Sequence, residues 1–473
     1  MPKNVDLFIN GKWVQTSSHA DVRNPFSGKV IAKVAQAGLK EIEEAVTSSV
    51  TAFEKNRSAP AYERAEILEK IAFGINQRRE EIAKTIVLEA GKPLQFSLGE
   101  VDRAVSTFTI AAEESKRMNG ELIPADRTPV GHGYTLLTRR FPIGPITAIS
   151  PFNFPLNLVA HKVAPALAVG NSIVLKPPPQ APLTSLLLAE IAEKAGTPPG
   201  MLNVTPCDVP EAETLATHAQ MKMLSFTGSA KVGWYLKGKA GKKKVALELG
   251  GNAAAIVHKD ADLEWTTKRL VSGSFAYAGQ VCISVQRIYV QETIYDAFIK
   301  KFLGEVKEVK TGDPMDPHTV VGPLIDSGAA DRVEQWIQEA KQGGAKILAG
   351  GGRKGNVIEP TVITDATQSL KVSCQEVFGP VVVVAPYKNM EDAFHLVNDS
   401  SFGLQAGLFT KNINHIFKAY ESLEVGGVMI NEYPMFRVDH MPYGGIKDSG
   451  CGREGVKYAM EEMTEIKLLA IKG

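Results

Sequence analysis

Cys282 stands in the segment YAGQVCISVQR, two residues after the Gly279-Gln280 step and before a β-branched run over residues 283–290. That run alternates in a way that predicts a strand, so the thiol is expected at the mouth of a strand. A thiolate in such a place can add to a carbonyl carbon and form a covalent intermediate. A free cysteine is more often a small packing residue of the interior. The local sequence leaves both interpretations of Cys282 open.

A carboxyl group and an amide group raise the same question. Glu248 lies in the apolar run VALELG, where a carboxylate is costly unless it has an ionic partner or a catalytic task. Asn153 lies in PFNFP, whose aromatic residues and prolines are expected to hold the amide rigid. The alternatives are a salt-bridged structural glutamate and an asparagine that caps the next helix through an Asx-turn. Neither alternative is excluded by the local sequence.

Two further segments have features of a phosphate site. The strand-like LSFTG leads through Gly228-Ser229 into a helical stretch, and a helix N-terminus offers unpaired N–H groups and a positive dipole end to an anion. Lys176 ends the strand-like SIVLK, which places an ammonium at the carboxyl edge of a sheet, where open α/β sheets bind ligands. Strand–glycine–helix turns and surface lysines are common, and neither of these two segments contains GxGxxG. Alone, these features are weak evidence.

The elements that must hold these residues alternate between strand and helix. Residues 7–14 predict a hairpin around Asn10-Gly11, and residues 39–112 have helical periodicity. Strands separated by helices of about 10 to 15 residues indicate βαβ crossovers, so we predict an α/β fold in two large lobes. The expected strands are 146–150, 172–176, 202–206, 223–228 and 245–250 in the first lobe, and 254–258, 286–291, 346–348, 379–386 and 405–409 in the second. The expected helices include 155–168, 182–195, 261–278, 292–308, 329–342 and 391–397.

Composition narrows the possible functions. A chain of 473 residues is expected to divide, since single cores stop growing near roughly 250 to 300 residues. The net charge of +1 gives no footprint for nucleic acid or an anionic membrane, and we interpret the run KGKAGKKK as a solvated helix end. We find neither a signal peptide nor an apolar run long enough to span a membrane.

The four cysteines lie far apart, so we expect no disulfide framework, no metal site, and a reduced, cytoplasmic protein.

Seven motifs together resemble those of the aldehyde dehydrogenase superfamily, in that family's order and spacing and over essentially the whole chain. In general character the chain is similar to lactaldehyde dehydrogenases and to non-phosphorylating glyceraldehyde-3-phosphate dehydrogenases. The resemblance implies two Rossmann-like parallel-sheet lobes with a small β oligomerisation element. The motifs are PFNFP (151–155), SFTGSAKVG (225–233), LELGGN (247–252), GQVC (279–282), EVFGPV (376–381), FGLQAGLFT (402–410) and PYGGIKDSGCGREG (442–455).

The resemblance assigns chemistry to three of these residues. Cys282 matches the nucleophile that forms a thiohemiacetal and, after hydride loss, a thioester. Asn153 matches the amide that stabilises the alkoxide together with the Cys282 N–H. Glu248 matches the general base that activates water, and it precedes Cys282 by 34 residues, as in members that release a free acid. Members that transfer the acyl group to coenzyme A lack this glutamate.

The resemblance also implies a nicotinamide dinucleotide, NAD or NADP. Strictly NAD-dependent members have a glutamate three residues after the lysine that matches Lys176, and Pro179 stands there in this chain. Without that carboxylate we expect the site to tolerate or prefer NADP. Asp208 replaces a glycine that relatives often have near the adenine, which leaves the adenine contacts undefined. The matching cofactor positions are Ile149, Ser150, Pro151, Phe152, Lys176, Pro179, Gly228, Ser229, Val232, Gly233, Leu249, Glu376 and Phe378.

The aldehyde itself is less well defined by the resemblance. Arg103, His161, Tyr433 and Arg437 match the region that lines the aldehyde tunnel, where they could hold an anionic or polyhydroxyl tail or form ordinary salt bridges. Phosphate-using relatives commonly have arginine before the nucleophile, and here the residue is Val281. We therefore expect a small hydroxyaldehyde of the lactaldehyde or glyceraldehyde type. A semialdehyde, a phosphorylated aldehyde, acyl transfer to coenzyme A and a catalytically silent relative are the alternatives. A cysteine hydrolase is disfavoured because no histidine has a motif context beside Cys282.

Domain boundaries follow from the same resemblance. Residues 1–123 and 143–250 are expected to bind the cofactor, 251–455 to carry the nucleophile, and 124–142 with 456–473 to form the oligomerisation element. The segments 120–142 and EIKLLAI look like exposed sheet edges, which proteins commonly bury against a second copy. We expect a homodimer or homotetramer that binds a small aldehyde, with no nucleic-acid or membrane partner.

Overall fold

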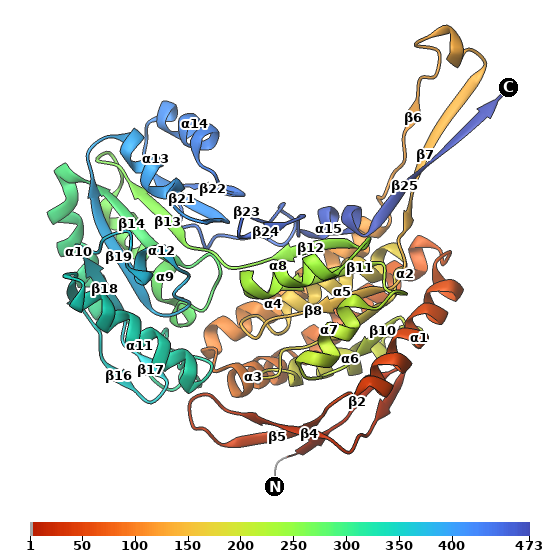
Figure 1. The fold of residues 1–473 in the computed structure, drawn as a ribbon, viewed down its shortest axis with the longest axis horizontal. Coiled ribbons are helices and arrows are strands. Elements are labelled where there is room, and N and C mark those ends of the chain that lie inside the picture. Colours follow the sequence, from red (N-terminus) through yellow and green to blue (C-terminus); the bar gives the residue numbers. More distant parts are fainter. Residues whose placement is uncertain (1–2) are drawn as a thin grey trace.

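The computed structural model describes residues 3–473, so only Met1 and Pro2 of the predicted 1–123 segment lie outside it. The chain forms two large α/β lobes side by side and a long β arm that projects from the first lobe, with the C-terminus at the end of the arm (Figure 1). This is the α/β architecture that the strand–helix alternation predicts. Among the described residues, no helix is long and apolar enough to cross a membrane.

An eight-stranded sheet forms the centre of the first lobe. Its middle strands are parallel, and the chain order reverses between β8 and β11, because β9 and β10 extend to one side and β11 and β12 to the other. Such a switch point is where open α/β sheets bind ligands at their carboxyl edge. In spatial order the strands are β24 (Gly450–Cys451), β12 (Lys244–Glu248), β11 (Met223–Thr227), β8 (Ile146–Ile149), β9 (Ile173–Lys176), β10 (Leu202–Val204), β2 (Leu7–Ile9) and β3 (Lys12–Val14).

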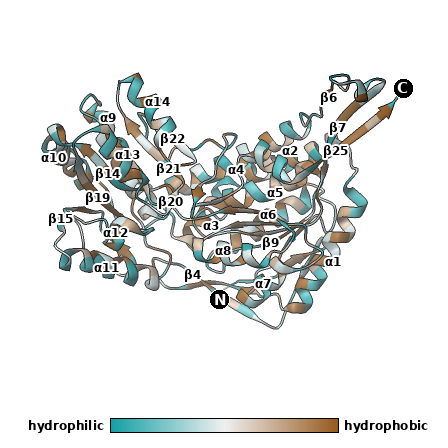
Figure 2. Cartoon of the chain, turned by 45° about the horizontal axis from the view of Figure 1, so that its top comes forward, coloured by the Kyte–Doolittle hydropathy of each residue, from teal (hydrophilic) through white to brown (hydrophobic). Residues whose placement is uncertain are grey.

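Helices cover both faces of this sheet and bury its apolar strands (Figure 2). Helix α5 is buried along its whole length, which explains why its sequence is apolar all round. The helices are α1 (Leu39–Asn56), α2 (Ala61–Gln77), α3 (Arg79–Ala90), α4 (Leu94–Ser115), α5 (Asn157–Val169), α6 (Leu183–Lys194), α7 (Val209–Thr217), α8 (Ala230–Lys239) and α15 (Val456–Glu462). A three-stranded sheet of β1 (Lys3–Val5), β5 (Val30–Ala35) and β4 (His19–Arg23) lies at the N-terminal end.

The second lobe has a seven-stranded sheet, parallel except for its edge strand β15. In spatial order the strands are β15 (Lys346–Ala349), β18 (Thr361–Thr364), β19 (Val381–Tyr387), β14 (Val285–Gln291), β13 (Ala253–Val257), β21 (Gln405–Phe409) and β22 (Gly427–Ile430). The helices are α9 (Leu263–Phe275), α10 (Tyr295–Lys307), α11 (Ser327–Gln342), α12 (Lys371–Cys374), α13 (Met390–Asn398) and α14 (Ile413–Ser422), with short 3-10 turns η2 (Ala276–Gly279) and η3 (Glu292–Ile294); a third such turn, η1 (Pro129–Gly131), lies in the arm between β6 and β7. The two-stranded pairs are β16 (Arg353–Lys354) with β17 (Val357–Ile358), and β20 (Phe402–Gly403) with β23 (Ile446–Lys447).

A four-residue link joins the two large sheets. Strand β12 ends at Glu248, the link Leu249–Asn252 follows, and β13 begins at Ala253. Cys282 comes just before β14, the neighbour of β13. The link therefore carries the chain from the carboxyl edge of the first sheet to the amino edge of the second, and it brings Glu248 and Cys282 to the same junction although they are 34 residues apart.

The arm consists of β6 (Leu122–Ile123), β7 (Tyr134–Pro142) and β25 (Thr464–Lys472). Strands β7 and β25 pair antiparallel along their full length, from Thr464 opposite Pro142 to Lys472 opposite Tyr134. Both strands have exposed apolar residues, and Figure 2 shows the hydrophobic colour along the arm. The exposed edge expected for 120–142 and the C-terminal EIKLLAI is thus one continuous ribbon.

Local differences from the sequence predictions are small. The strand after Cys282 begins at Val285 rather than Ile283, because Cys282 and its neighbours form a turn. The structure also contains strands β18 and β22 and helix α14, which the sequence analysis did not predict. The hairpin of β2 and β3 around Asn10-Gly11 is confirmed. The boundary expected at 455 stays a prediction, although β24, inside 251–455, pairs with β12 of the first sheet.

Candidate active site

The turn before Cys282 has an uncommon backbone. Tyr277, Ala278 and Gly279 follow one another with φ of 52°, 54° and 67°, all in the left-handed region that suits glycine best. Tyr277 is nearly fully buried, and its hydroxyl donates to the Ala90 carbonyl at 3.2 Å, which fixes the turn to the first lobe. Gly251 packs against the back of the turn, where a Cβ would lie 2.2 Å from the Cys282 carbonyl oxygen. The surrounding structure thus fixes the position of Cys282.

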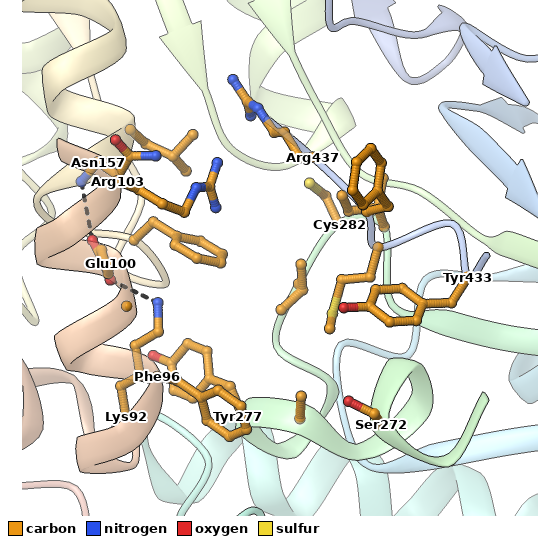
Figure 3. Close-up of a pocket in the computed structure, with 18 of the residues that line it drawn as sticks. Lys92, Phe96, Glu100, Arg103, Asn157, Ser272, Tyr277, Cys282, Tyr433 and Arg437 are labelled. Carbon is orange, nitrogen blue, oxygen red and sulfur yellow. Dashed lines mark hydrogen bonds and ion pairs between the residues drawn. The ribbon is translucent and has the colours of Figure 1, made fainter. Parts of the chain in front are cut away.

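Cys282 borders a cavity of about 330 Å³ between the lobes. Figure 3 shows Arg103 pointing toward this cavity from helix α4, with Tyr433 on the opposite wall beside Cys282. Apolar groups such as Val281 and Phe154 form much of the remaining wall. The volume suits a small molecule, and the mixture of apolar wall and a few charged groups is typical of ligand pockets.

The thiol of Cys282 contacts one polar side chain closely. Its Sγ lies 3.0 Å from the Tyr443 hydroxyl. Burial raises the pKa of the Cys282 thiol to about 12, whereas the hydrogen bond with Tyr443 acts to lower it. The carboxylate of Glu376 raises that pKa further, and the guanidinium of Arg437 lowers it. A thiolate at this site therefore depends on nearby donors and positive charge.

Asn153 lies in the loop after β8, facing the nucleophile turn. Its side-chain N–H donates to the Gln280 carbonyl at 3.0 Å, and the residue is 3% exposed. Its own backbone carbonyl accepts from the buried Lys92 ammonium at 3.0 Å, and Lys92 in turn pairs with Glu100 at 2.6 Å. The buried ion pair and its hydrogen bonds therefore hold the Asn153 backbone beside the two residues that precede Cys282.

Glu248 is buried at the end of β12, with one carboxylate oxygen lacking a hydrogen-bond partner within residues 3–473. Burial and the nearby Glu454 carboxylate raise the pKa of Glu248 well above its ordinary value. Glu454 itself pairs with Lys162 at 3.2 Å and with Arg437 at 3.1 Å, and these cations lower the pKa of Glu454 despite its burial. Gly444 leaves room for Glu248, since a Cβ there would lie 2.9 Å from a carboxylate oxygen.

The carboxyl edge of the first sheet has the features of a dinucleotide site. Ser150 follows β8 and Thr227 ends β11 at the switch point, and their buried hydroxyls lack hydrogen-bond partners within the described chain. Lys176 is 8% exposed, and burial lowers the pKa of its ammonium. Ser229 precedes helix α8 without a side-chain cap, so the helix N–H groups are open to an anion. These residues fit a ligand with ribose and phosphate groups.

Three further cofactor positions are a carboxylate and two aromatic rings, and the carboxylate lies close enough to Cys282 to raise its pKa. Glu376 accepts a hydrogen bond from the Gly251 N–H at 3.0 Å, and burial raises the pKa of Glu376 to about 7. The rings of Phe152 and Phe378 meet edge to face at 5.9 Å. A carboxylate and an aromatic pair beside a nucleophile can hold the ribose and the ring of a nicotinamide.

Comparisons with known proteins point to one family. The model of the aldehyde dehydrogenase family matches residues 13–469. A 3-sulfolactaldehyde dehydrogenase of Priestia aryabhattai is 46% identical over 99% of this chain and 98% of that protein. A lactaldehyde dehydrogenase of Methanocaldococcus jannaschii is 43% identical over 98% of this chain and 100% of that protein.

Solved structures agree. Aldehyde dehydrogenase 21 from Physcomitrella patens, in complex with the reaction product succinate, superposes with a TM-score of 0.98 at 45% identity, covering 100% of this chain and 99% of that one. The glyceraldehyde-3-phosphate dehydrogenase GapN of Methanocaldococcus jannaschii, complexed with NADP, superposes with a TM-score of 0.93 at 42% identity, covering 97% of this chain and 100% of that one.

The chain belongs to the aldehyde dehydrogenase family. It is an NAD(P)-dependent oxidoreductase that acts on an aldehyde, and the resemblance inferred from the seven motifs is confirmed. The superfamily fold is confirmed by the structural neighbours.

The structure of this aldehyde dehydrogenase gathers most of the residues selected from the sequence. Arg103, Cys282, Tyr433 and Arg437 line one cavity. His161 is 1% exposed and does not line that cavity. Its ring forms a hydrogen bond with Asp439 at 2.9 Å, and Asp439 also accepts a hydrogen bond from Arg103 at 2.7 Å. His161 is therefore connected to the pocket residue Arg103 through the Asp439 carboxylate. The cofactor positions lie at the carboxyl edge of the first sheet and at the junction between the lobes; among them Pro179, Ser229 and Val232 are exposed.

Three contributors to the site were not selected from the sequence. Tyr443 belongs to the quoted motif PYGGIKDSGCGREG, but its hydroxyl contact with a residue 161 positions away has no local signal. Glu454 is the penultimate residue of the same motif and could have been singled out as a carboxylate between glycines. Lys92 lies in EAGKP, where the Gly91 turn predicted only a helix end.

Proposed function

We propose that this enzyme oxidises a short 2-hydroxyaldehyde of the lactaldehyde type to the free 2-hydroxy acid. The observation that carries the proposal is the placement of Cys282 on the wall of a cavity of about 330 Å³, a size that suits a small aldehyde. The apolar Val281 beside the nucleophile suits an uncharged carbon chain. The lactaldehyde dehydrogenase relative supports the same substrate class. The 3-sulfolactaldehyde dehydrogenase relative is named for an anionic aldehyde and supports the second candidate below.

The reaction that we propose begins with Cys282. Its thiolate adds to the aldehyde carbon, and the resulting alkoxide accepts hydrogen bonds from the Asn153 amide and the Cys282 N–H. A bound nicotinamide dinucleotide supplies the hydride acceptor, and the thiohemiacetal becomes a thioester on Cys282. Glu248 then takes a proton from water, which attacks the thioester carbonyl and releases the acid and the thiolate. The raised pKa of Glu248 makes it a better base once it is ionised.

An aldehyde with an anionic tail is the second candidate substrate. The Arg103 side chain is 29% exposed and lines the cavity, and the Arg437 Nε is buried without a hydrogen-bond partner among the described residues. Both guanidiniums already pair with carboxylates, Asp439 and Glu454, which offsets their charge. A carboxylate or sulfonate would therefore gain less here than beside unpaired arginines.

We also infer that NADP is accepted at least as well as NAD. Pro179 is exposed three residues after Lys176, and no carboxylate stands at that position to repel a 2′-phosphate. The complex of the GapN relative with NADP supports this inference. The buried Lys176 ammonium remains available to the ribose.

Finally, we propose that the chain assembles as a homodimer or homotetramer through the arm, with 1–123 and 143–250 binding the cofactor and 251–455 carrying the nucleophile. The support is the ribbon of β7 and β25, on which Ile466, Leu468 and Leu469 are each more than half exposed. Apolar ribbons of this kind are usually covered by a partner.

The function is tested by following reduced-cofactor absorbance with a panel of aldehydes, using NAD and NADP in parallel. The panel contains lactaldehyde, glyceraldehyde, 3-sulfolactaldehyde, succinic semialdehyde and benzaldehyde, and Cys282→Ala is the control. Cys282-dependent turnover that is fastest with lactaldehyde or glyceraldehyde supports the proposal. Faster turnover of the two anionic aldehydes, lost in Arg103→Gln, supports the second candidate instead. Failure with every aldehyde despite cofactor binding contradicts both.

A further inference from the structure

Tyr443 has a hydroxyl that the scheme above does not use. The residue is 3% exposed, and its oxygen lies 3.0 Å from the Cys282 Sγ. It stands in the loop between β22 and β23, 161 residues from the cysteine, so this contact exists only through the tertiary fold. A phenol in contact with a nucleophilic sulfur has a direct route to influence the reaction.

The direction of this hydrogen bond follows from the state of the sulfur. With a neutral thiol, either atom could donate. A thiolate has no proton, so in the reactive state the Tyr443 O–H must donate and the sulfur must accept. Burial and the neighbouring Cys282 raise the pKa of Tyr443 well above its ordinary value, which keeps the phenol protonated while the thiol ionises. The thiol proton therefore leaves to water in the cavity rather than to Tyr443.

The phenol ring is itself held in place. The Arg437 guanidinium lies 3.7 Å from the centre of the Tyr443 ring, and its side chain, 6% exposed, donates to Glu454 at 3.1 Å. A cation over the face of a ring is an attractive arrangement, and it is stronger where water is excluded. This stack restricts rotation of the ring and directs the hydroxyl toward Cys282.

We propose that Tyr443 is a further catalytic residue of the reaction, whose phenol O–H donates to the Cys282 thiolate and stabilises it in the attacking position. The proposal rests on the role of Cys282 as nucleophile given above. When the sulfur forms its bond to the aldehyde carbon, it loses its negative charge and becomes a weak acceptor. The O–H is then free to bond the hydroxyl on the neighbouring carbon, while Tyr443 keeps its proton throughout.

Other charged groups near the same sulfur also shift the pKa of Cys282. Glu376 and Glu248 both act to raise the pKa of Cys282, and Arg437 acts to lower it. These three side chains are unchanged when the Tyr443 oxygen alone is removed. The contribution of the hydroxyl can therefore be measured separately.

The test is the pH profile of Cys282 alkylation by iodoacetamide in Tyr443→Phe, without aldehyde or cofactor, quantified on the peptide that contains Cys282. The profile is expected to move at least one pH unit upward, so that alkylation below the midpoint is about tenfold slower while the rate at high pH converges with that of the unaltered enzyme. Tyr433→Phe removes a phenol oxygen from the same cavity and is expected to leave the profile in place, whatever its effect on turnover. Profiles of Tyr443→Phe and the unaltered enzyme that coincide overturn the proposal.

Two further readings separate this role from a structural one. A packing defect would slow alkylation at every pH, whereas loss of the donor slows it only where the thiol is protonated. If Tyr443→Phe does not fold, 3-fluorotyrosine at position 443 keeps the shape and strengthens the donor, and the profile must then move to lower pH; an unmoved profile overturns the proposal. Alkylation needs no substrate, so absence of turnover in the aldehyde panel would remain a distinct result.

Discussion

The Glu248 carboxylate is buried, and its burial determines the pH at which the group can act as a base. Its own burial is the main reason that its pKa is raised, and the Glu454 carboxylate adds to the effect. The cations Lys162 and Arg437 act in the opposite direction and are shared with Glu454. Glu248 therefore lies close to the positive charges of Lys162 and Arg437, but it forms no direct ion pair among the described residues.

The pH dependence of turnover follows from this arrangement. As the proposed general base, Glu248 works only when ionised, so kcat is expected to fall as pH drops through its raised pKa. In Glu454→Gln one negative charge near Glu248 is lost, ionisation becomes easier, and the acid limb of the kcat profile moves to lower pH. The same change leaves Lys162 and Arg437 without their anion, which costs about 3–5 kcal/mol in stability and is checked by thermal unfolding.

The matched control for that profile is Glu248→Gln. Removing a general base typically slows the step by about 10² to 10⁴. Reduced cofactor should then appear as one fast equivalent per subunit, followed by a slow phase without the acid limb. An acid limb that stays unmoved in Glu454→Gln, or that survives in Glu248→Gln, would show that another group controls it.

We expect the residue at position 179 to influence the preference for NAD or NADP. The change Pro179→Glu places a carboxylate where a 2′-phosphate would lie, so kcat/KM for NADP is expected to fall at least about tenfold relative to NAD, equivalent to about 1.4 kcal/mol. Pro179→Gln introduces a side chain of the same size without the charge and is expected to change the ratio little. The ratio is measured by reduced-cofactor absorbance. Equal shifts in both variants would attribute the effect to the loss of proline rather than to charge.

At the scale of elements, the turn η2 connects helix α9 to the nucleophile. Two non-glycine residues in the left-handed region cost of order 1–3 kcal/mol each, and the turn is kept because buried contacts on every side determine its shape. Phe378, in the loop before β19, also has a positive φ of 48°. Strained backbone thus occurs both beside Cys282 and in a loop at the expected cofactor cleft.

Gly279→Ala tests how strictly this turn positions the sulfur. Gly279 has φ of 67°, and a Cβ there would lie 2.2 Å from the Gly379 carbonyl oxygen. We expect unfolding free energy to fall by about 1–3 kcal/mol and kcat/KM to fall more than about tenfold, since small displacements of reacting groups are costly. Gly304→Ala, inside helix α10 with nothing within 4 Å of its added Cβ, should instead stabilise by about 0.5–1 kcal/mol and leave kinetics unchanged. Unaltered kinetics in Gly279→Ala would show that the turn tolerates movement.

At the scale of the whole molecule, the arm is the feature that the two lobes do not bury. Ile466 and Leu468 are 60% and 56% exposed, and being two residues apart they lie on one face of β25. Cross-strand pairing satisfies the backbone, but the apolar side chains still face solvent. A second copy of the chain is the simplest partner to cover this face, because most soluble oligomers are symmetric assemblies of identical chains.

The double change Ile466→Lys and Leu468→Lys should break this contact. The expected result is a smaller particle by light scattering coupled to size exclusion, with an unfolding transition of each subunit that is still cooperative. The control is Phe417→Lys with Tyr420→Lys, which places the same charges on exposed apolar residues of α14, away from the arm. A particle mass equal to that of the unaltered enzyme would exclude this face of the arm from assembly.

Much of the architecture follows from local pattern. The strands of both sheets and their crossover helices can be located because apolar periodicity and turn residues are properties of neighbouring positions. Helix α5 could be predicted although its sequence is apolar on every face, because it lies between two predicted strands as the crossover helix of a βαβ unit. Strand β22 was not predicted because it is short and half-buried along its whole length, without alternation. Helix α14 was not predicted although Ile413, Ile416, Phe417 and Tyr420 recur at helical spacing, so its signal was present in the sequence.

The sequence alone determined the family, through seven motifs whose order and spacing leave little room for coincidence, and with it the expectation that Cys282, Glu248 and Asn153 act together. The tertiary structure alone decided which distant side chains touch them. Tyr443 reaches Cys282 across 161 residues, and Arg103 reaches Asp439 across 336. The physical reason is that such contacts depend on how two sheets are joined and which way a side chain points, and neither quantity is expressed in the local periodicity of a chain.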